Sequence, residues 1–108
     1  MNTFDPNKLT EELVKAGYDW ADTNAVATQL EELKKTLLSE LSLGYPSLSN
    51  AAATDSARAM PEYKTHILEM VEARRKANRA MVRYKGMQAL NEGRRTLEST
   101  RRAEMVMR

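Results

Sequence analysis

The longest uninterrupted helical pattern in the chain runs from Pro61 to about Met107 and reads PEYKTHILEMVEARRKANRAMVRYKGMQALNEGRRTLESTRRAEMVM. Proline suits the first position of a helix, and Glu62 in the first turn favours the positive end of the helix dipole. No further proline follows, and Gly86 and Gly93 are the only weak helix formers expected to matter. At ~1.5 Å per residue the segment predicts a helix about 70 Å long, too long to be the core helix of a monomeric globule along its whole length.

A second long helix is predicted on the N-terminal side, from Pro6 to about Ser42. Asp5 suits the N-cap and Pro6 the first helical position. Apolar residues then recur at spacings of three, four and seven, which defines one helical face. They are Leu9, Leu13, Trp20, Ala27, Leu30, Leu33, Leu37 and Leu41. Gly17 leaves an alternative open, because a short helix could end in a turn at Gly17 and Tyr18 before a longer one begins.

Residues 43–60 are predicted to connect the two helices. Gly44 suits a helix C-cap, and Pro46 cannot continue a helix. The residues that follow are small and polar, and they form either a loop or a short helix opened by Ser49 or Asn50.

Composition favours an all-α domain that needs partners. The chain has 108 residues, of which 30% are charged, with one Phe and one Trp, so it can bury only a modest core. A long helix with an apolar stripe needs a partner to cover that stripe. We therefore predict a single domain over residues 1–108, an elongated helical hairpin with a short linking helix or loop. It is expected to self-associate into a homo-oligomeric bundle or coiled coil.

Several kinds of chemistry are disfavoured by the same composition. The absence of cysteine excludes disulfides, thiolate nucleophiles and zinc–thiolate sites, and it favours a reducing, cytosolic setting. No apolar run is long enough to cross a membrane, and no signal-peptide pattern is present. His66, Glu69 and Glu72 could in principle bracket a metal ion, but this spacing is common by chance in charged helices. We predict no catalytic residue, no metal site, no cofactor and no enzymatic activity.

Charge is divided sharply along the chain. Residues 1–55 hold 4 basic and 9 acidic side chains, a net −5, whereas residues 56–108 hold 13 basic and 6 acidic, a net +7. Such segregation indicates either an anionic partner or two halves that pair with each other.

Six of the cations fall on one line of the C-terminal helix. At about 100° per residue they form a narrow stripe, nearly opposite the apolar face, which we call the basic ridge. Its members are Lys76, Arg79, Arg83, Arg94, Arg101 and Arg108. Rows of this kind bind phosphate backbones, and each contact releases a counterion. The alternative interpretation is the solvated outer face of a bundle helix, which charged rows usually form.

Aromatic residues are not interleaved with these cations. Tyr63 and Tyr84 fall on the apolar face of the same helix and are predicted to be core residues. The sequence therefore does not indicate base stacking on aromatic side chains. Contact with the phosphate backbone is the mode of nucleic-acid binding that it still allows.

Beyond Tyr84 the apolar face becomes polar and basic, with Arg95 and Arg102 on it. One interpretation is that this end of the helix lies beside the start of the first helix, so that the two arginines pair with carboxylates there. The candidate carboxylates are Asp5, Glu11, Glu12 and Asp19. The other interpretation is that this end projects from the body and is itself a binding surface.

Four segments carry a resemblance to a known group of proteins. They are Trp20–Asp22, 33–38 (LKKTLL), 70–84 (MVEARRKANRAMVRY) and 94–105 (RRTLESTRRAEM). Together they resemble a family of small all-helical proteins encoded by tailed bacteriophages and prophages, often near recombination or single-strand-annealing genes. The similarity spans roughly residues 18–106. That family has no established activity, so the resemblance implies no functional residue; it implies a viral source, the bacterial host cytoplasm and a link to DNA metabolism.

These observations predict a non-enzymatic phage accessory protein that binds DNA, or takes part in recombination, through the basic ridge. The alternative is an adaptor or inhibitor that binds a host or phage enzyme without touching nucleic acid. In both cases we expect a homo-oligomer that makes no contact with a membrane.

Overall fold

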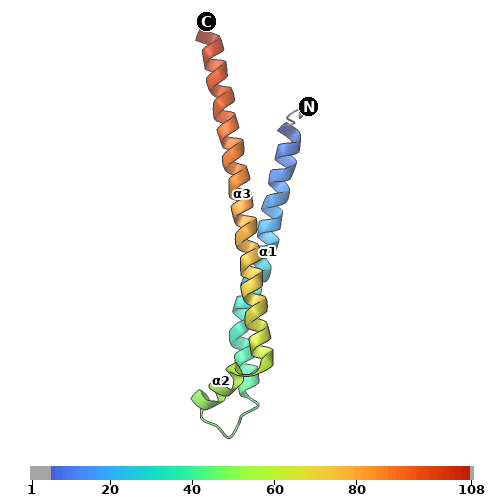
Figure 1. The fold of residues 1–108 in the computed structure, drawn as a ribbon, viewed down its shortest axis with the longest axis vertical. Helices are drawn as coiled ribbons and strands as arrows, with labels where there is room; N and C mark the ends of the chain where they lie inside the picture. The colour runs from blue at the N-terminus through green and yellow to red at the C-terminus, as the bar shows by residue number, and fades with distance from the viewer. Residues whose placement is uncertain (1–5, 108) are drawn as a thin grey trace.

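The computed structural model describes residues 6–107, which form three α-helices in one elongated hairpin (Figure 1). Helix α1 spans Pro6–Ser42, α2 spans Asn50–Arg58 and α3 spans Pro61–Met107. The molecule measures 85 × 27 × 15 Å with a radius of gyration of 23.8 Å, against about 13 Å for a compact chain of this length. The predicted fold, an all-α hairpin of two long helices with a short linking helix, is confirmed.

Helix α1 continues through Gly17 without interruption, so the alternative of a turn at Gly17 and Tyr18 is wrong. Proline at position 6 begins the helix as predicted, whereas Asp5 lies outside the described residues. At the other end, the Gly44 N–H donates to the Leu41 carbonyl over 3.1 Å, which tightens the chain into a turn. The backbone of Gly44 does not take a positive φ, so this glycine is not a left-handed cap.

The connector contains a helix rather than a loop alone. The Ser49 hydroxyl accepts a hydrogen bond from the Ala52 N–H over 3.2 Å, which makes Ser49 the N-cap of α2. Ala53 and Ala57 are the buried residues of α2, and this helix packs mainly against the end of α1.

Three contacts fix the antiparallel register of α1 and α3. His66 binds the Leu30 carbonyl, Arg74 binds Glu31, and the Tyr84 ring lies against Gly17. Continued at equal rise on both helices, this register brings residue 94 level with the start of α1. The last turns of α3 therefore extend beyond α1, and Figure 1 shows the two helices diverging towards that end.

The contact between the helices is made by small side chains. Every buried residue in the described part of the chain is an alanine: Ala16, Ala27, Ala53, Ala57, Ala77 and Ala80. Among residues 7–106 the larger apolar side chains are only partly covered, and thirteen of them are exposed. A compact monomer of 12.3 kDa would expose about 6,100 Å², whereas this hairpin exposes 8581 Å².

Candidate nucleic-acid interface

The first three members of the basic ridge lie on the hairpin itself. Lys76, Arg79 and Arg83 are exposed, and none of them forms an ion pair within the described part of the chain. Ala77 and Ala80 are the α3 residues buried against α1. At 100° per residue Lys76 lies about 40° from Ala80, so the ridge runs along the edge of the helix–helix contact. Measured from the predicted apolar face, Arg79 and Arg83 each lie about 160° from the half-buried Met81, which is the placement that the sequence predicts.

The remaining members lie near or beyond the start of α1. Arg94 is half-buried, with its guanidinium 3.8 Å from the Glu98 carboxylate. Arg101 is exposed on the projecting end of α3, and Arg108 lies outside the described residues. Arg83 and Arg94 are about 16 Å apart along the helix axis, so the ridge consists of two clusters rather than one continuous row.

The line of the ridge is not purely cationic. At the same angular positions α3 carries Glu72, Leu90 and Leu97, and all three side chains are exposed. The two leucines lie in and after the gap between the clusters. From the sequence, Leu90 and Leu97 are recognised only as lying off the apolar face; the helical period of 100° per residue is the signal that places them on the line of the ridge.

Arg95 and Arg102 do not pair with α1. Both are exposed, and among residues 7–106 no ion pair joins either of them to an α1 carboxylate. Asp5, one of the carboxylates considered for this role, lies outside the described range. The described contacts therefore agree with the interpretation in which this end of α3 projects from the body.

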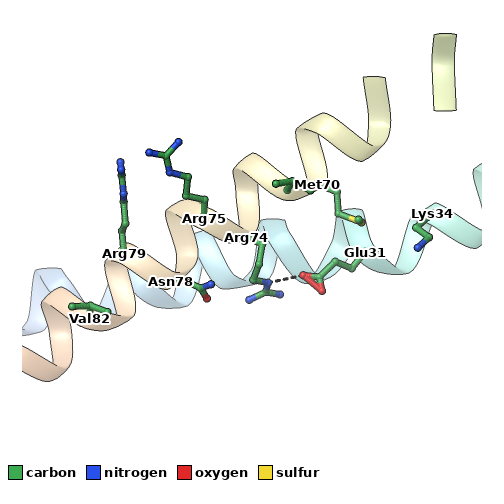
Figure 2. Close-up of a pocket in the computed structure, with 9 residues that line it drawn as sticks. Glu31, Lys34, Met70, Arg74, Arg75, Asn78, Arg79 and Val82 are labelled. Atoms are coloured by element: carbon green, nitrogen blue, oxygen red, sulfur yellow. Dashed lines mark hydrogen bonds and ion pairs between the residues drawn. The ribbon is translucent and has the colours of Figure 1, made fainter. Parts of the chain in front are cut away.

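One cation in the same region has a structural role that the sequence did not reveal. Arg74 donates to Glu31 over 2.6 Å, to Asn24 over 2.8 Å and to Thr28 over 3.3 Å. Figure 2 shows Arg74 turned towards Glu31 on α1, whereas its neighbour Arg75 points away from α1. The spacing of the three α1 partners, four and then three residues, places them on one face, and this polar stripe was the signal available in the sequence.

His66 and the aromatic residues also hold the hairpin together. The Nε2 atom of His66 lies 2.7 Å from the Leu30 carbonyl oxygen, which turns the imidazole towards the backbone of α1. The rings of Trp20 and Tyr84 are 5.6 Å apart and tilted by 34°. The prediction that Tyr84 belongs to the apolar contact is confirmed. Within the described residues, no group of three His, Asp or Glu side chains could hold a metal ion.

Comparisons with known proteins assign this chain to no family. No protein-family model, curated protein or solved structure matches the chain. Among the described helices, none combines the length and the apolar character needed to cross a bilayer.

Proposed function

We propose that this protein is a non-enzymatic accessory protein that binds DNA through phosphate contacts of the basic ridge. The observation that carries the proposal is the first cluster, Lys76, Arg79 and Arg83, which is exposed and free of ion pairs in the described part of the chain. Between Glu72 and Glu92 the chain carries six cations and no carboxylate. Glu72 lies one turn before Lys76 on the same line, so Arg79 and Arg83 are the members of the cluster farthest from an α3 carboxylate.

The expected mode of binding is electrostatic and independent of sequence. Arginine and lysine on one helix edge can follow a phosphate backbone, and counterion release supplies most of the affinity. Tyr84 packs against Trp20 and is not available as a platform for stacking bases. We expect the second cluster, Arg94 and Arg101, to extend the same contact along the projecting end of α3.

The resemblance to small helical phage proteins supplies the setting that we propose. It is the cytoplasm of an infected bacterial host, with a role associated with DNA recombination. A DNA-binding protein without enzymatic activity suits that setting, since such a protein acts by holding or covering the strands on which other proteins work.

The test is a titration of labelled single- and double-stranded DNA at two salt concentrations. The triple variant K76Q, R79Q and R83Q should weaken binding, and loss of three contacts should flatten the plot of log K against log salt by about 2.7. The matched control is K8Q, K15Q and K35Q, which removes the same charge from exposed positions of α1. Absence of binding at about 50 mM salt, where counterion release favours it most, would overturn the proposal.

A second candidate function, a protein–protein adaptor, is favoured by Leu90 and Leu97. These exposed leucines lie seven residues apart on one line of α3, which is the spacing of a helix that packs against another helix. Their replacement by Gln should leave DNA affinity unchanged under the first proposal. If wild-type protein instead binds a host or phage enzyme and the double variant does not, the adaptor function is supported.

A further inference from the structure

The hairpin exposes far more surface than a chain of its size needs to expose. The excess over a compact monomer is about 2,500 Å². A standard protein–protein interface takes about 800 Å² from each partner, so this excess could supply such an interface. Because alanines make the contact between α1 and α3, the larger apolar side chains remain exposed and are available for such an interface.

Four of these exposed residues, two from each long helix, lie on one side of the hairpin, which we call the Val82 face; exposed Val26 and Leu68 line a groove on the other side. On α3 it carries Val71 and Val82, which line a groove next to the Arg74–Glu31 pair (Figure 2). On α1 it carries Val14 and Tyr18, which line a second groove that reaches Tyr84. The Arg74 bonds to Asn24 and Thr28 fix which side of α1 this is, because at 100° per residue Val14 and Tyr18 lie on the same side as these partners.

We propose that the occupant of the Val82 face is a second copy of this chain, packed in parallel so that α1 of each copy lies on α3 of the other. The product is a dimeric four-helix bundle in which the valines, Tyr18 and Met70 form the core that the lone hairpin lacks. This assembly is independent of whether the protein binds DNA.

Charge selects this orientation over the other two-fold arrangement. Helix α1 has 4 basic and 7 acidic side chains, a net −3, and α3 has 11 basic and 6 acidic, a net +5. A two-fold axis along the molecule places α1 of one copy over α3 of the other. An axis across the molecule places α3 over α3, which brings two positive helices together.

The helix directions are compatible with this arrangement but do not distinguish it from the other one, because helices in contact between the copies are antiparallel in both. Antiparallel contacts align opposite helix dipoles, as in up-and-down bundles. The choice between the two arrangements therefore rests on charge. In the parallel dimer both projecting ends of α3 emerge at the same end. Lys76 lines the groove on the opposite side of the hairpin and stays uncovered, whereas Arg79 lines the groove of the Val82 face and lies at the rim of the interface.

The first experiment measures mass by light scattering and sedimentation. Wild-type protein should have twice the mass of 12.3 kDa, and V71E and V82E should raise the dimer dissociation constant roughly 100-fold, because each places charge in an apolar interface. The matched control is V26E on the other side of the hairpin, where Val26 is 52% exposed, against 57% for Val71 and 67% for Val82. A monomeric wild type, or equal loss of the dimer in the control, would overturn the proposal.

The second experiment tests the relative orientation of the two copies and leaves the Val82 face unchanged. The chain contains no cysteine, so S47C and A103C each allow one spin label, at opposite ends of the molecule. In the parallel dimer both variants should give distances set by the 27 and 15 Å cross-section. In the antiparallel dimer the labels at residue 103 would stand about 70 Å apart. Long distances in both variants would overturn the parallel arrangement even if V71E or V82E failed to fold.

Discussion

The ring of Tyr84 lies directly against Gly17, with its Cε2 atom 3.1 Å from the point where a Cβ of residue 17 would stand. The ring is held from two further directions. The Trp20 ring packs against it at a tilt, with 5.6 Å between the ring centroids, and the Gln88 side chain donates to its hydroxyl over 2.9 Å. Glycine is therefore present at this position to admit a ring and not to break the helix.

The substitution G17A is expected to lower the free energy of unfolding by about 1 kcal/mol, since overpacking against a fixed ring exceeds the gain in helix propensity. The control is G86A, where an added Cβ meets nothing within 4 Å. That variant should gain up to about 1 kcal/mol. Urea unfolding of both variants gives the sign of each change in the free energy of unfolding. A stabilised G17A would show that the Tyr84 ring moves easily.

Arg74 provides a second prediction, because one guanidinium serves three α1 side chains. Lysine carries its three donors on one nitrogen and cannot reach Glu31, Asn24 and Thr28 as the three guanidinium nitrogens do, so R74K should destabilise the fold by about 1–2 kcal/mol. R75K is the matched control, because Arg75 is exposed and has only a 3.9 Å pair with Glu72. It should stay within about 0.5 kcal/mol of wild type in thermal unfolding. Equal effects in the two variants would contradict the role given to Arg74.

The sequence predicted the helices well because their boundaries are local chemistry. Pro6 and Pro61 each begin a helix where proline is favoured, and the apolar spacing between them has the helical period. Gly17 could not be resolved in the same way. Its environment depends on Tyr84, which is distant in the chain, and a glycine that admits a ring looks in sequence like one that breaks a helix.

The site was less predictable than the fold, because it depends on how α3 is turned. The helical wheel gave the relative positions of Lys76, Arg79 and Arg83 correctly. It also placed Ala77 on the face that contacts α1. It did not show that Ala80, which lies nearer the ridge, is buried as well, because that depends on where α1 lies.

The alanine contact gives a third prediction. Ala77 is 1% exposed and faces α1, so A77L would force the helices apart and should destabilise the hairpin by about 1–3 kcal/mol. A103L introduces the same side chain at an exposed position of α3 and should change stability by less than about 0.5 kcal/mol. Chemical unfolding monitored by circular dichroism compares them. A77L with wild-type stability would mean that the two helices are not in close contact there.

The projecting end of α3 gives the last prediction. Residues 95–106 are all exposed and lie beyond the start of α1, so they contribute little to the hairpin. A chain that ends at Arg95 should keep its free energy of unfolding within about 1 kcal/mol, whereas its helical circular-dichroism signal should fall in proportion to the residues removed. It should also bind DNA more weakly, since Arg101, Arg102 and Arg108 are lost. Undiminished affinity for DNA would confine the DNA interface to the Lys76–Arg83 edge. Global unfolding of the shortened chain would show that the end of α3 packs against another part of the assembly.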